Sequence, residues 1–177
     1  MRFFKRLDMG VLSDAEIVEL IRTTPPLLEH IIDDKIQLQP AGIDLTLKDV
    51  LEFNSAGTID FTNKERMLSE CKRISFKSGS MHLKKGVYKV IYNEIIRIPH
   101  DCIGLAFPRS SLLRCGAFLQ CAVWDPGYEG RSESLLVVEN KHGIKLKKNA
   151  RLVQLILLKL NKKTKGTYSG TYKKENI

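Results

Sequence analysis

The chain has 177 residues, 43% of them hydrophobic, a size and composition that suit one globular domain with its own core. No apolar run reaches the ~18 residues of a membrane span, and no apolar stretch follows the basic N-terminus as a secretory signal requires. The formal net charge of +9 favours an anionic partner, which nucleic acid, a membrane surface or a phosphate-rich small molecule would each provide.

The first predicted element is a helix that begins after a capping box. Ser13 and Glu16 stand three residues apart, the spacing at which each side chain bonds the other's backbone N–H. The helix should end before Thr24, because the proline pair at 25–26 cannot continue it. Residues 1–8 before it are expected to form an N-terminal extension.

From residue 36 onward the sequence predicts short strands. The run at 43–47 alternates apolar and polar residues, as a half-buried strand does. Turn-forming residues separate the runs about every ten positions, the rhythm of a barrel or jelly roll. Further runs rich in β-branched or aromatic residues lie at 87–92, 94–98, 134–138 and 152–158.

The four cysteines form no CxxC pair and have no metal-ligand spacing with the four histidines. We therefore expect reduced, mostly buried thiols in a cytoplasmic protein. They are Cys71, Cys102, Cys115 and Cys121.

The segment Phe107-Pro-Arg-Ser-Ser-Leu112 offers groups that bind phosphate. Arg109 provides a planar pair of donors for phosphate oxygens, and the hydroxyls of Ser110 and Ser111 stand beside it. A string this short also occurs by chance, so it is weak evidence alone.

The stretch AVWDPGYEG at 122–130 predicts a tight turn. Pro126 presets its own φ and Gly127 tolerates a positive φ. Taken alone the turn is the tip of a hairpin. The alternative is that it holds Asp125 and Tyr128 at the mouth of a pocket.

Two more stretches carry polar groups at the borders of predicted strands. Asp44 follows a small-residue turn, and Arg151 and Gln154 lie near the start of a later strand. Residues three apart face opposite sides of a regular strand, so Arg151 and Gln154 serve one ligand only if the strand begins between them.

Taken in order, PAGIDL, PRSSL, WDPGYEG, NARLVQL and a Gly-Tyr tail resemble the five motifs of the deoxyuridine triphosphatase and deoxycytidine triphosphate deaminase superfamily. The resemblance spans residues 9–177. The contexts GLAFPRSSLLRCG and RSESLLVVENKHG look most similar to its archaeal deoxyuridine triphosphatase branch.

This resemblance implies a distorted β-barrel or jelly roll of the β-clip type, with a short N-terminal helix, that assembles as a homotrimer with sites at subunit interfaces. It implies one β domain over residues 1–160 and a flexible lid over residues 161–177. The implied reaction is Mg²⁺-dependent hydrolysis of dUTP to dUMP and pyrophosphate, which keeps uracil out of DNA. Neither nucleic acid nor a membrane is then expected as a partner.

The resemblance also implies roles for individual residues. Asp125 corresponds to the general base that activates water at the α-phosphorus, Tyr128 to the residue under the deoxyribose, and Asp44 to a carboxylate near the water shell of Mg²⁺. The implied phosphate-binding residues are Arg109, Ser110, Ser111, Arg151 and Gln154.

The segment 119–124 corresponds to the hairpin whose main chain binds the base edge, and it contains Leu119, Gln120 and Trp124. A packing role for Trp124 is favoured over base stacking. The tail lacks the glycine-rich fifth motif, and its implied lid residues are Tyr168, Gly170 and Tyr172.

A deaminase of the same fold is the main alternative. Deamination needs a general base beside the cytosine ring, and the resemblance to the deaminase family implies that this base is a glutamate on the strand after the third motif. The two possible registers place Leu135 or Val137 there, and Glu133 fits neither. Arg114 matches a deaminase feature, so a dCTP deaminase or a bifunctional enzyme stays open, as does a non-catalytic nucleotide-binding regulatory module.

Overall fold

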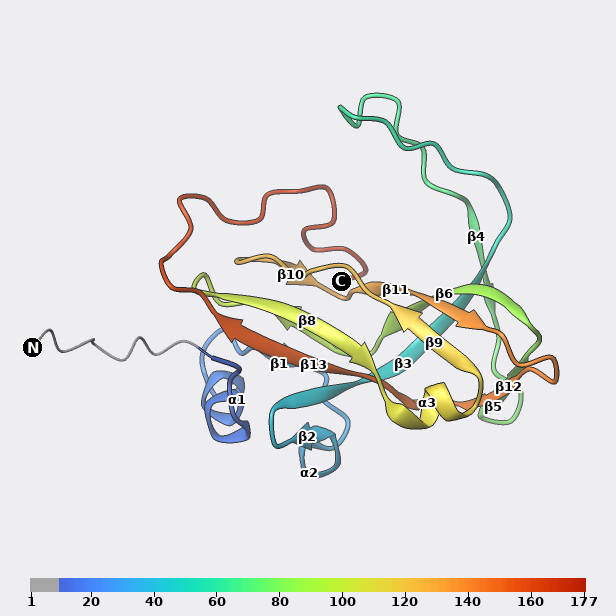
Figure 1. The fold of residues 1–177 in the computed structure, drawn as a ribbon, viewed down its shortest axis with the longest axis horizontal. Helices are drawn as coiled ribbons and strands as arrows, with labels where there is room; N and C mark the ends of the chain where they lie inside the picture. The colour runs from blue at the N-terminus through green and yellow to red at the C-terminus, as the bar shows by residue number, and fades with distance from the viewer. Residues whose placement is uncertain (1–9) are drawn as a thin grey trace, which may run out of the picture.

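The computed structural model describes residues 10–177, so the extension predicted at residues 1–8 lies outside the described residues. The described part is mainly β (Figure 1). Its helices are α1 (Asp14–Ile21), α2 (Asp34–Gln37) and α3 (Ser110–Arg114). None of them is long and apolar enough to cross a membrane.

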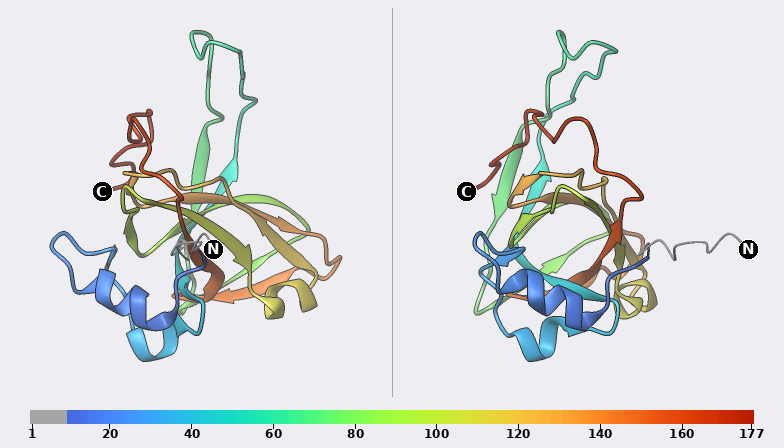
Figure 2. Two further views of the ribbon diagram at one scale, coloured as in Figure 1. Left: turned by 60° about the vertical axis from the view of Figure 1, so that its left-hand side comes forward. Right: turned by 90° about the vertical axis from the view of Figure 1, so that its left-hand side faces the viewer.

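One large antiparallel sheet dominates the fold and curls into a nearly closed barrel, seen almost end-on in the right view of Figure 2. Its strand order is β8-β13-β3-β6-β11-β9, and β2 and β4 also pair with β3. These strands are β2 (Leu38–Gln39), β3 (Gly42–Phe53), β4 (Cys71–Ile74), β6 (Gly86–Tyr92), β8 (Cys102–Pro108), β9 (Ala117–Gln120), β11 (Glu133–Val138) and β13 (Arg151–Lys159).

Two small sheets complete the body. The first has the order β1-β7-β10 and lies near α1, whereas the second is the β12-β5 pair at the other end. The bounds are β1 (Leu28–Glu29), β5 (Ser80–Leu83), β7 (Ile95–Arg97), β10 (Glu129–Gly130) and β12 (Ile144–Lys147). The predicted run at 94–98 is therefore a strand of only three residues.

The capping box of α1 is confirmed. The Ser13 hydroxyl accepts from the Glu16 N–H, and the Ser13 N–H donates to Glu16 Oε2 at 2.8 Å. The helix ends at Ile21, as the following prolines require. It buries Ile17 completely against the barrel.

The prediction of a half-buried strand at 43–47 is wrong. Strand β3 runs from Gly42 to Phe53, and its polar residues Asp44 and Thr46 are nearly as buried as the neighbouring Leu45 and Leu47. The alternating apolar and polar residues do lie on opposite faces of the strand, but the rest of the protein buries both faces. A buried polar layer lies over the face that carries Asp44 and Thr46.

The centre of that layer is Glu94, whose side chain is fully buried. Its carboxylate accepts from the Thr46 N–H (2.9 Å), the Thr46 hydroxyl (2.6 Å) and Gln37 Nε2 (2.8 Å). Gln37 Nε2 also donates to the Asp44 carbonyl at 2.8 Å. Since buried polar groups must be paired, these bonds fix the β3 backbone from the Asp44 carbonyl to the Thr46 N–H.

The expectation of mostly buried cysteines is also wrong. All four are free thiols, but only Cys102 is buried, whereas Cys71 and Cys121 are half-buried and Cys115 is exposed. Burial, together with neighbouring Asp101, raises the pKa of the Cys102 thiol to about 11. It therefore stays protonated near neutral pH.

Two segments leave the barrel. The loop at residues 54–70 projects away from it as a long arm, and the C-terminal tail crosses back over β10 (Figures 1 and 2). The arm exposes several apolar side chains, among them a fully exposed Phe61.

We predict that Glu94→Gln alters how stability depends on pH. Burial raises the pKa of Glu94 above its ordinary value of 4.5, so the folded state binds its proton more tightly than the unfolded state does. The resulting stabilisation is present below the unfolded pKa and is lost as pH rises through the folded pKa. The free energy of unfolding of the wild type, minus that of Glu94→Gln, should therefore fall in denaturant titrations as the pH rises above the ordinary pKa of 4.5. Glu139→Gln, at an exposed carboxylate, is the matched control, and a pH-independent difference for Glu94→Gln would contradict the prediction.

Candidate functional site

The Asp125–Tyr128 turn forms as predicted. The Tyr128 N–H donates to the Asp125 carbonyl at 3.0 Å, and Gly127 has a φ of +79°, which together define a type II turn with Pro126 at its second position. A further bond from the Gly127 N–H to the Ile98 carbonyl ties the turn to the end of β7. The Asp125 side chain is exposed to solvent.

Tyr128, by contrast, is buried, with 6% of its surface exposed. Its hydroxyl lies 2.9 Å from Ser132 Oγ and donates to Glu175 Oε1 at 2.6 Å. Tyr168 from the tail packs edge-on against its ring, with 5.6 Å between ring centroids. Burial and the bond to Glu175 raise the pKa of Tyr128 far above its ordinary value, so its hydroxyl is a permanent donor.

The predicted base-binding segment, residues 119–124, runs from the end of β9 to the turn. Leu119 and Trp124 point into the core, and Trp124 Nε1 donates to Ser132 Oγ. The backbone of Trp124 exchanges two hydrogen bonds with Gly104 at 2.9 and 3.0 Å. The Trp124 side chain therefore packs in the core, as the sequence analysis favoured. Gln120 is exposed to solvent. Main-chain binding of a base by this segment stays a prediction.

Two predicted phosphate-binding arginines converge on one carboxylate oxygen of Asp44. Asp44 Oδ2 lies 3.0 Å from Arg109 Nε and 3.1 Å from Arg151 Nη1. Asp44 is almost fully buried, and both arginine side chains are about 30% exposed. Burial raises the pKa of Asp44, and the two guanidinium groups oppose that shift. Two cations facing one anion leave a local excess of positive charge, which suits an anionic ligand.

Asp44 and Arg109 line a pocket of about 390 Å³, and Arg151 is linked to this pocket by its ion pair with Asp44. Ser110, the first residue of α3, lies at its edge, while Ser111 on the same short helix is exposed outside it. The Arg109 N–H donates to the Leu152 carbonyl at 2.9 Å, so the residue before α3 is tied to β13. The lining residues are Gln39, Asp44, Phe107, Pro108, Arg109, Ser110, Gln154 and Ile156.

The expectation about Arg151 and Gln154 is corrected by a β-bulge. Strand β13 begins at Arg151, not between the two residues. Arg151 pairs with Thr46 but Val153 pairs with Leu45, so Leu152 is an extra residue in the ladder. Gln154 then lies opposite Asp44, on the same face as Arg151. The bulge is the reason that both side chains reach one site.

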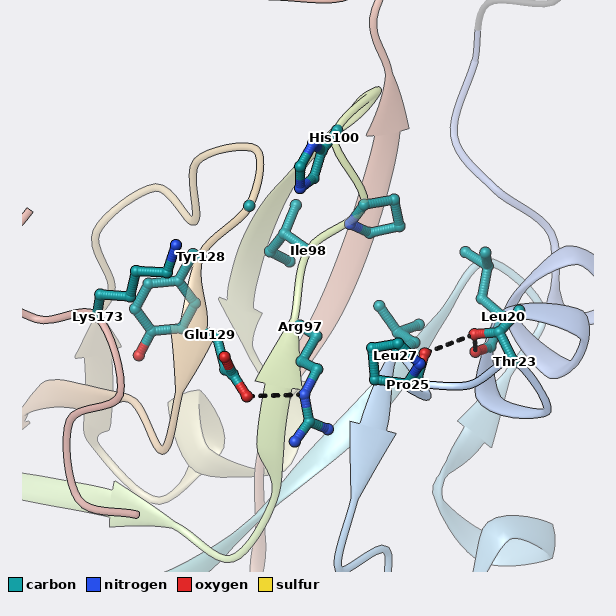
Figure 3. Close-up of a pocket in the computed structure, with 12 residues that line it drawn as sticks. Leu20, Thr23, Pro25, Leu27, Arg97, Ile98, His100, Tyr128, Glu129 and Lys173 are labelled. Atoms are coloured by element: carbon teal, nitrogen blue, oxygen red, sulfur yellow. Dashed lines mark hydrogen bonds and ion pairs between the residues drawn. The ribbon is translucent and has the colours of Figure 1, made fainter. Parts of the chain in front are cut away.

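The third-motif residues line other cavities. Tyr128 and Gly127 border a cavity of about 360 Å³ between the turn and the segment after α1, with Arg97, His100 and Lys173 along its wall (Figure 3). Arg97 is held there by Glu29 at 2.8 Å and Glu129 at 2.9 Å. None of the phosphate-site residues lines this cavity. One chain therefore presents two separate groups of predicted site residues.

The tail residues predicted as a lid lie against the third motif. Tyr168 and Tyr172 line a small cavity of about 90 Å³ together with Trp124 and Tyr128. Gly170 lies under the ring of Tyr168, where an added Cβ would come within 2.6 Å of the hydroxyl. The same cavity contains Glu175, a site residue that the sequence analysis missed because it stands in a polar, basic tail without a motif.

The positions that a deaminase base would occupy lie on the outer face of β11. Ser134 and Leu136 point into the core, so Glu133, Leu135 and Val137 share the opposite face. Glu133 forms an ion pair with Lys89 at 2.8 Å. Arg114, at the end of α3, is exposed. Residues 10–177 contain no group of three His, Cys, Asp or Glu side chains that could hold a metal.

A family profile described as dCTP deaminase-like matches residues 11–160. A Methanosarcina mazei protein named probable deoxyuridine 5'-triphosphate nucleotidohydrolase is 52% identical over 169 residues, covering 95% of this chain and 99% of that protein. The deoxyuridine 5'-triphosphate nucleotidohydrolase of Methanocaldococcus jannaschii is 42% identical over 139 residues, covering 77% and 87%.

Among solved structures, the 2'-deoxycytidine 5'-triphosphate deaminase of Agrobacterium tumefaciens is similar in fold. It superposes with a TM-score of 0.64 at 24% identity, over 85% of this chain and 48% of that one. The profile match, the archaeal relatives and the barrel agree: this chain is a member of the dUTPase and dCTP deaminase superfamily.

Proposed function

We propose that this protein is a dUTP diphosphatase, which hydrolyses dUTP to dUMP and pyrophosphate. Relatives that are about half identical over almost the whole chain carry the name deoxyuridine triphosphate nucleotidohydrolase. The observation that carries the proposal in this chain is the pocket lined by Asp44 and Arg109, with Arg151 paired to the same Asp44 carboxylate. Its excess positive charge matches a triphosphate, which the overall charge of +9 also attracts.

The outer face of β11 favours hydrolysis over deamination. Deamination requires a base beside the pyrimidine, and Leu135 and Val137 have no proton to exchange. Glu133 is the only carboxylate on this strand, and it is engaged by Lys89. A regulatory protein without activity would retain binding but release no pyrophosphate from dUTP.

The proposed mechanism gives Asp125 the role of general base. Its exposed carboxylate sits on a turn whose backbone is fixed by hydrogen bonds, which suits a group that must orient and deprotonate one water. Arg109, Arg151, Ser110, Ser111 and Gln154 bind the phosphates. Tyr128 and the backbone of residues 119–124 bind the sugar and the base.

Magnesium suits this site only as a companion of the substrate. The described residues offer no three-ligand group, and Asp44 is already paired with two arginines. Mg²⁺ keeps much of its water shell and binds phosphate oxygens readily, so a single carboxylate that contacts it through water is sufficient. The ion would neutralise charge on the phosphates.

We further propose that the active unit is a homotrimer in which a second copy completes each site. The support is that neither Asp125 nor Tyr128 lines the phosphate pocket of its own chain, and that Tyr128 lines a different cavity. The β11 face also exposes apolar side chains, including Phe118, Val87 and Leu135, which a neighbouring copy would cover. Residues 1–160 as the barrel unit, residues 161–177 as a mobile lid, and a cytoplasmic location belong to the same proposal.

Asp125→Asn should abolish pyrophosphate release and leave dUTP affinity nearly unchanged. Asparagine keeps the size of the side chain but does not accept the proton of the water. Pyrophosphate release and calorimetric titration with dUTP would test both parts. Near-normal turnover would show that another group is the base.

Arg109→Ala should raise the dissociation constant of dUTP by roughly tenfold or more, because a charge-assisted bond to phosphate is lost. Deoxyuridine, which has no phosphate, should bind the variant and the wild type equally. Arg22→Ala, at an exposed arginine at the end of α1, is the control. Equal dUTP affinity for Arg109→Ala and the control would remove Arg109 from the site.

Mixing the two inactive variants tests the shared site. If Asp125 and Arg109 of different copies form one site, co-expressed Asp125→Asn and Arg109→Ala chains should regain activity. About one quarter of the interfaces in a random head-to-tail ring combine two intact halves. No recovery in mixed oligomers, verified by mass, would place the whole site within one chain.

A further inference from the structure

The last residues of the chain lie along β10 as a short added strand. We call residues 174–176 the strap. The Lys174 N–H donates to the Glu129 carbonyl at 2.6 Å, and the Arg131 N–H donates to the Glu175 carbonyl at 2.9 Å. Gly130 and Glu175 form a parallel bridge. The strap therefore extends the small sheet that carries the end of the third motif.

A side chain fastens the end of the strap. Asn176 Nδ2 donates to the Arg131 carbonyl at 3.0 Å, and Arg131 Nε donates back to the Asn176 carbonyl at 3.2 Å. Asn176 has a φ of +55°, a conformation that asparagine tolerates better than most residues. Asn176 Nδ2 also donates to Glu133 Oε1 at 3.2 Å. These bonds bury Arg131 under the tail.

Glu175 connects the strap to Tyr128. Its carboxylate accepts a hydrogen bond from the Tyr128 hydroxyl. That hydroxyl also contacts the Ser132 hydroxyl, which accepts a hydrogen bond from Trp124 Nε1. The four side chains form one continuous hydrogen-bonded row from the core to the tail. The hydroxyl is the only polar group of the Tyr128 side chain, and its hydrogen bonds to Glu175 and Ser132 fix its position.

Gly130 makes this contact possible. A Cβ at position 130 would lie 2.7 Å from the Tyr128 hydroxyl oxygen and 3.2 Å from Glu175 Cγ. Gly130 is not in the left-handed region, so space, not backbone freedom, is the reason for a glycine here. The final glycine of the Asp-x-x-Tyr-x-Gly motif thus leaves room for the tyrosine to meet the strap.

We propose that Glu175 is a positioning residue for Tyr128 and that the strap thereby sets the discrimination between deoxyribose and ribose. The inference rests on the proposed function, in which Tyr128 lies under the sugar. Glu175 fixes the Tyr128 hydroxyl, and Tyr168 supports the ring edge. A fixed ring leaves no room to adjust for a 2'-hydroxyl, whereas a loosened ring does.

Trp124 reports on the strap without any substrate. It is the single tryptophan of the chain and lines the same small cavity as Tyr128 and Glu175. In Glu175→Ala, acrylamide quenching of its fluorescence should rise roughly twofold or more, because the strap opens locally. Gly130→Ala should produce the same change. Glu139→Ala, at an exposed carboxylate, should match the wild type.

Discrimination is measured as the ratio of the UTP and dUTP dissociation constants in the Asp125→Asn background, so that no turnover is needed. This ratio should fall about fivefold or more in Glu175→Ala, the loss expected for one hydrogen bond, and stay constant in Glu139→Ala. An unchanged ratio overturns the positioning role, even where quenching rises. Absence of pyrophosphate release by the wild type would instead refute the proposed function. The Trp124 quenching and the ratio of dissociation constants would still test whether Glu175 positions Tyr128.

Discussion

The buried carboxylate of Asp44 is the contact on which the arrangement of the phosphate pocket depends. Arg109 directly follows β8 and Arg151 begins the neighbouring strand β13, so the two guanidinium groups lie at the same end of this strand pair and would repel each other without an anion between them. One carboxylate oxygen binds both, so the two guanidinium groups are held in place before a ligand arrives. Such preorganisation lowers the entropic cost of binding a flexible triphosphate.

The strand backbone that carries the Asp44 carboxylate is held by a buried polar layer. Glu94, Thr46 and Gln37 exchange hydrogen bonds beneath it, and no cation among the described residues pairs with Glu94. Its charge is met by dipoles alone, which demands close geometry and tolerates little movement. These bonds hold the β3 backbone from the Asp44 carbonyl to the Thr46 N–H, directly beside the site.

Local chemistry was predictable from the sequence, and long-range packing was not. The capping box of α1 and the Asp125–Tyr128 turn depend on residues adjacent in the chain, and both were predicted correctly. The burial of Asp44 and Thr46 depends on Glu94, about fifty positions away, which no local alternation reveals. The contacts of Glu175 were missed for the same reason, because a polar tail looks mobile unless the groove that receives it is known.

Because of the bulge at Leu152, the number of residues between Arg151 and Gln154 determines whether both side chains lie on the same face of β13. Side chains on a strand alternate strictly, so inserting or deleting one residue between Arg151 and Gln154 would place the two side chains on opposite faces of β13. Substitutions that conserve length would leave Arg151 and Gln154 on the same face. Evolution at this strand is therefore freer to exchange side chains than to gain or lose a residue, and single-residue indels here would separate phosphate-binding proteins from relatives that keep only the barrel.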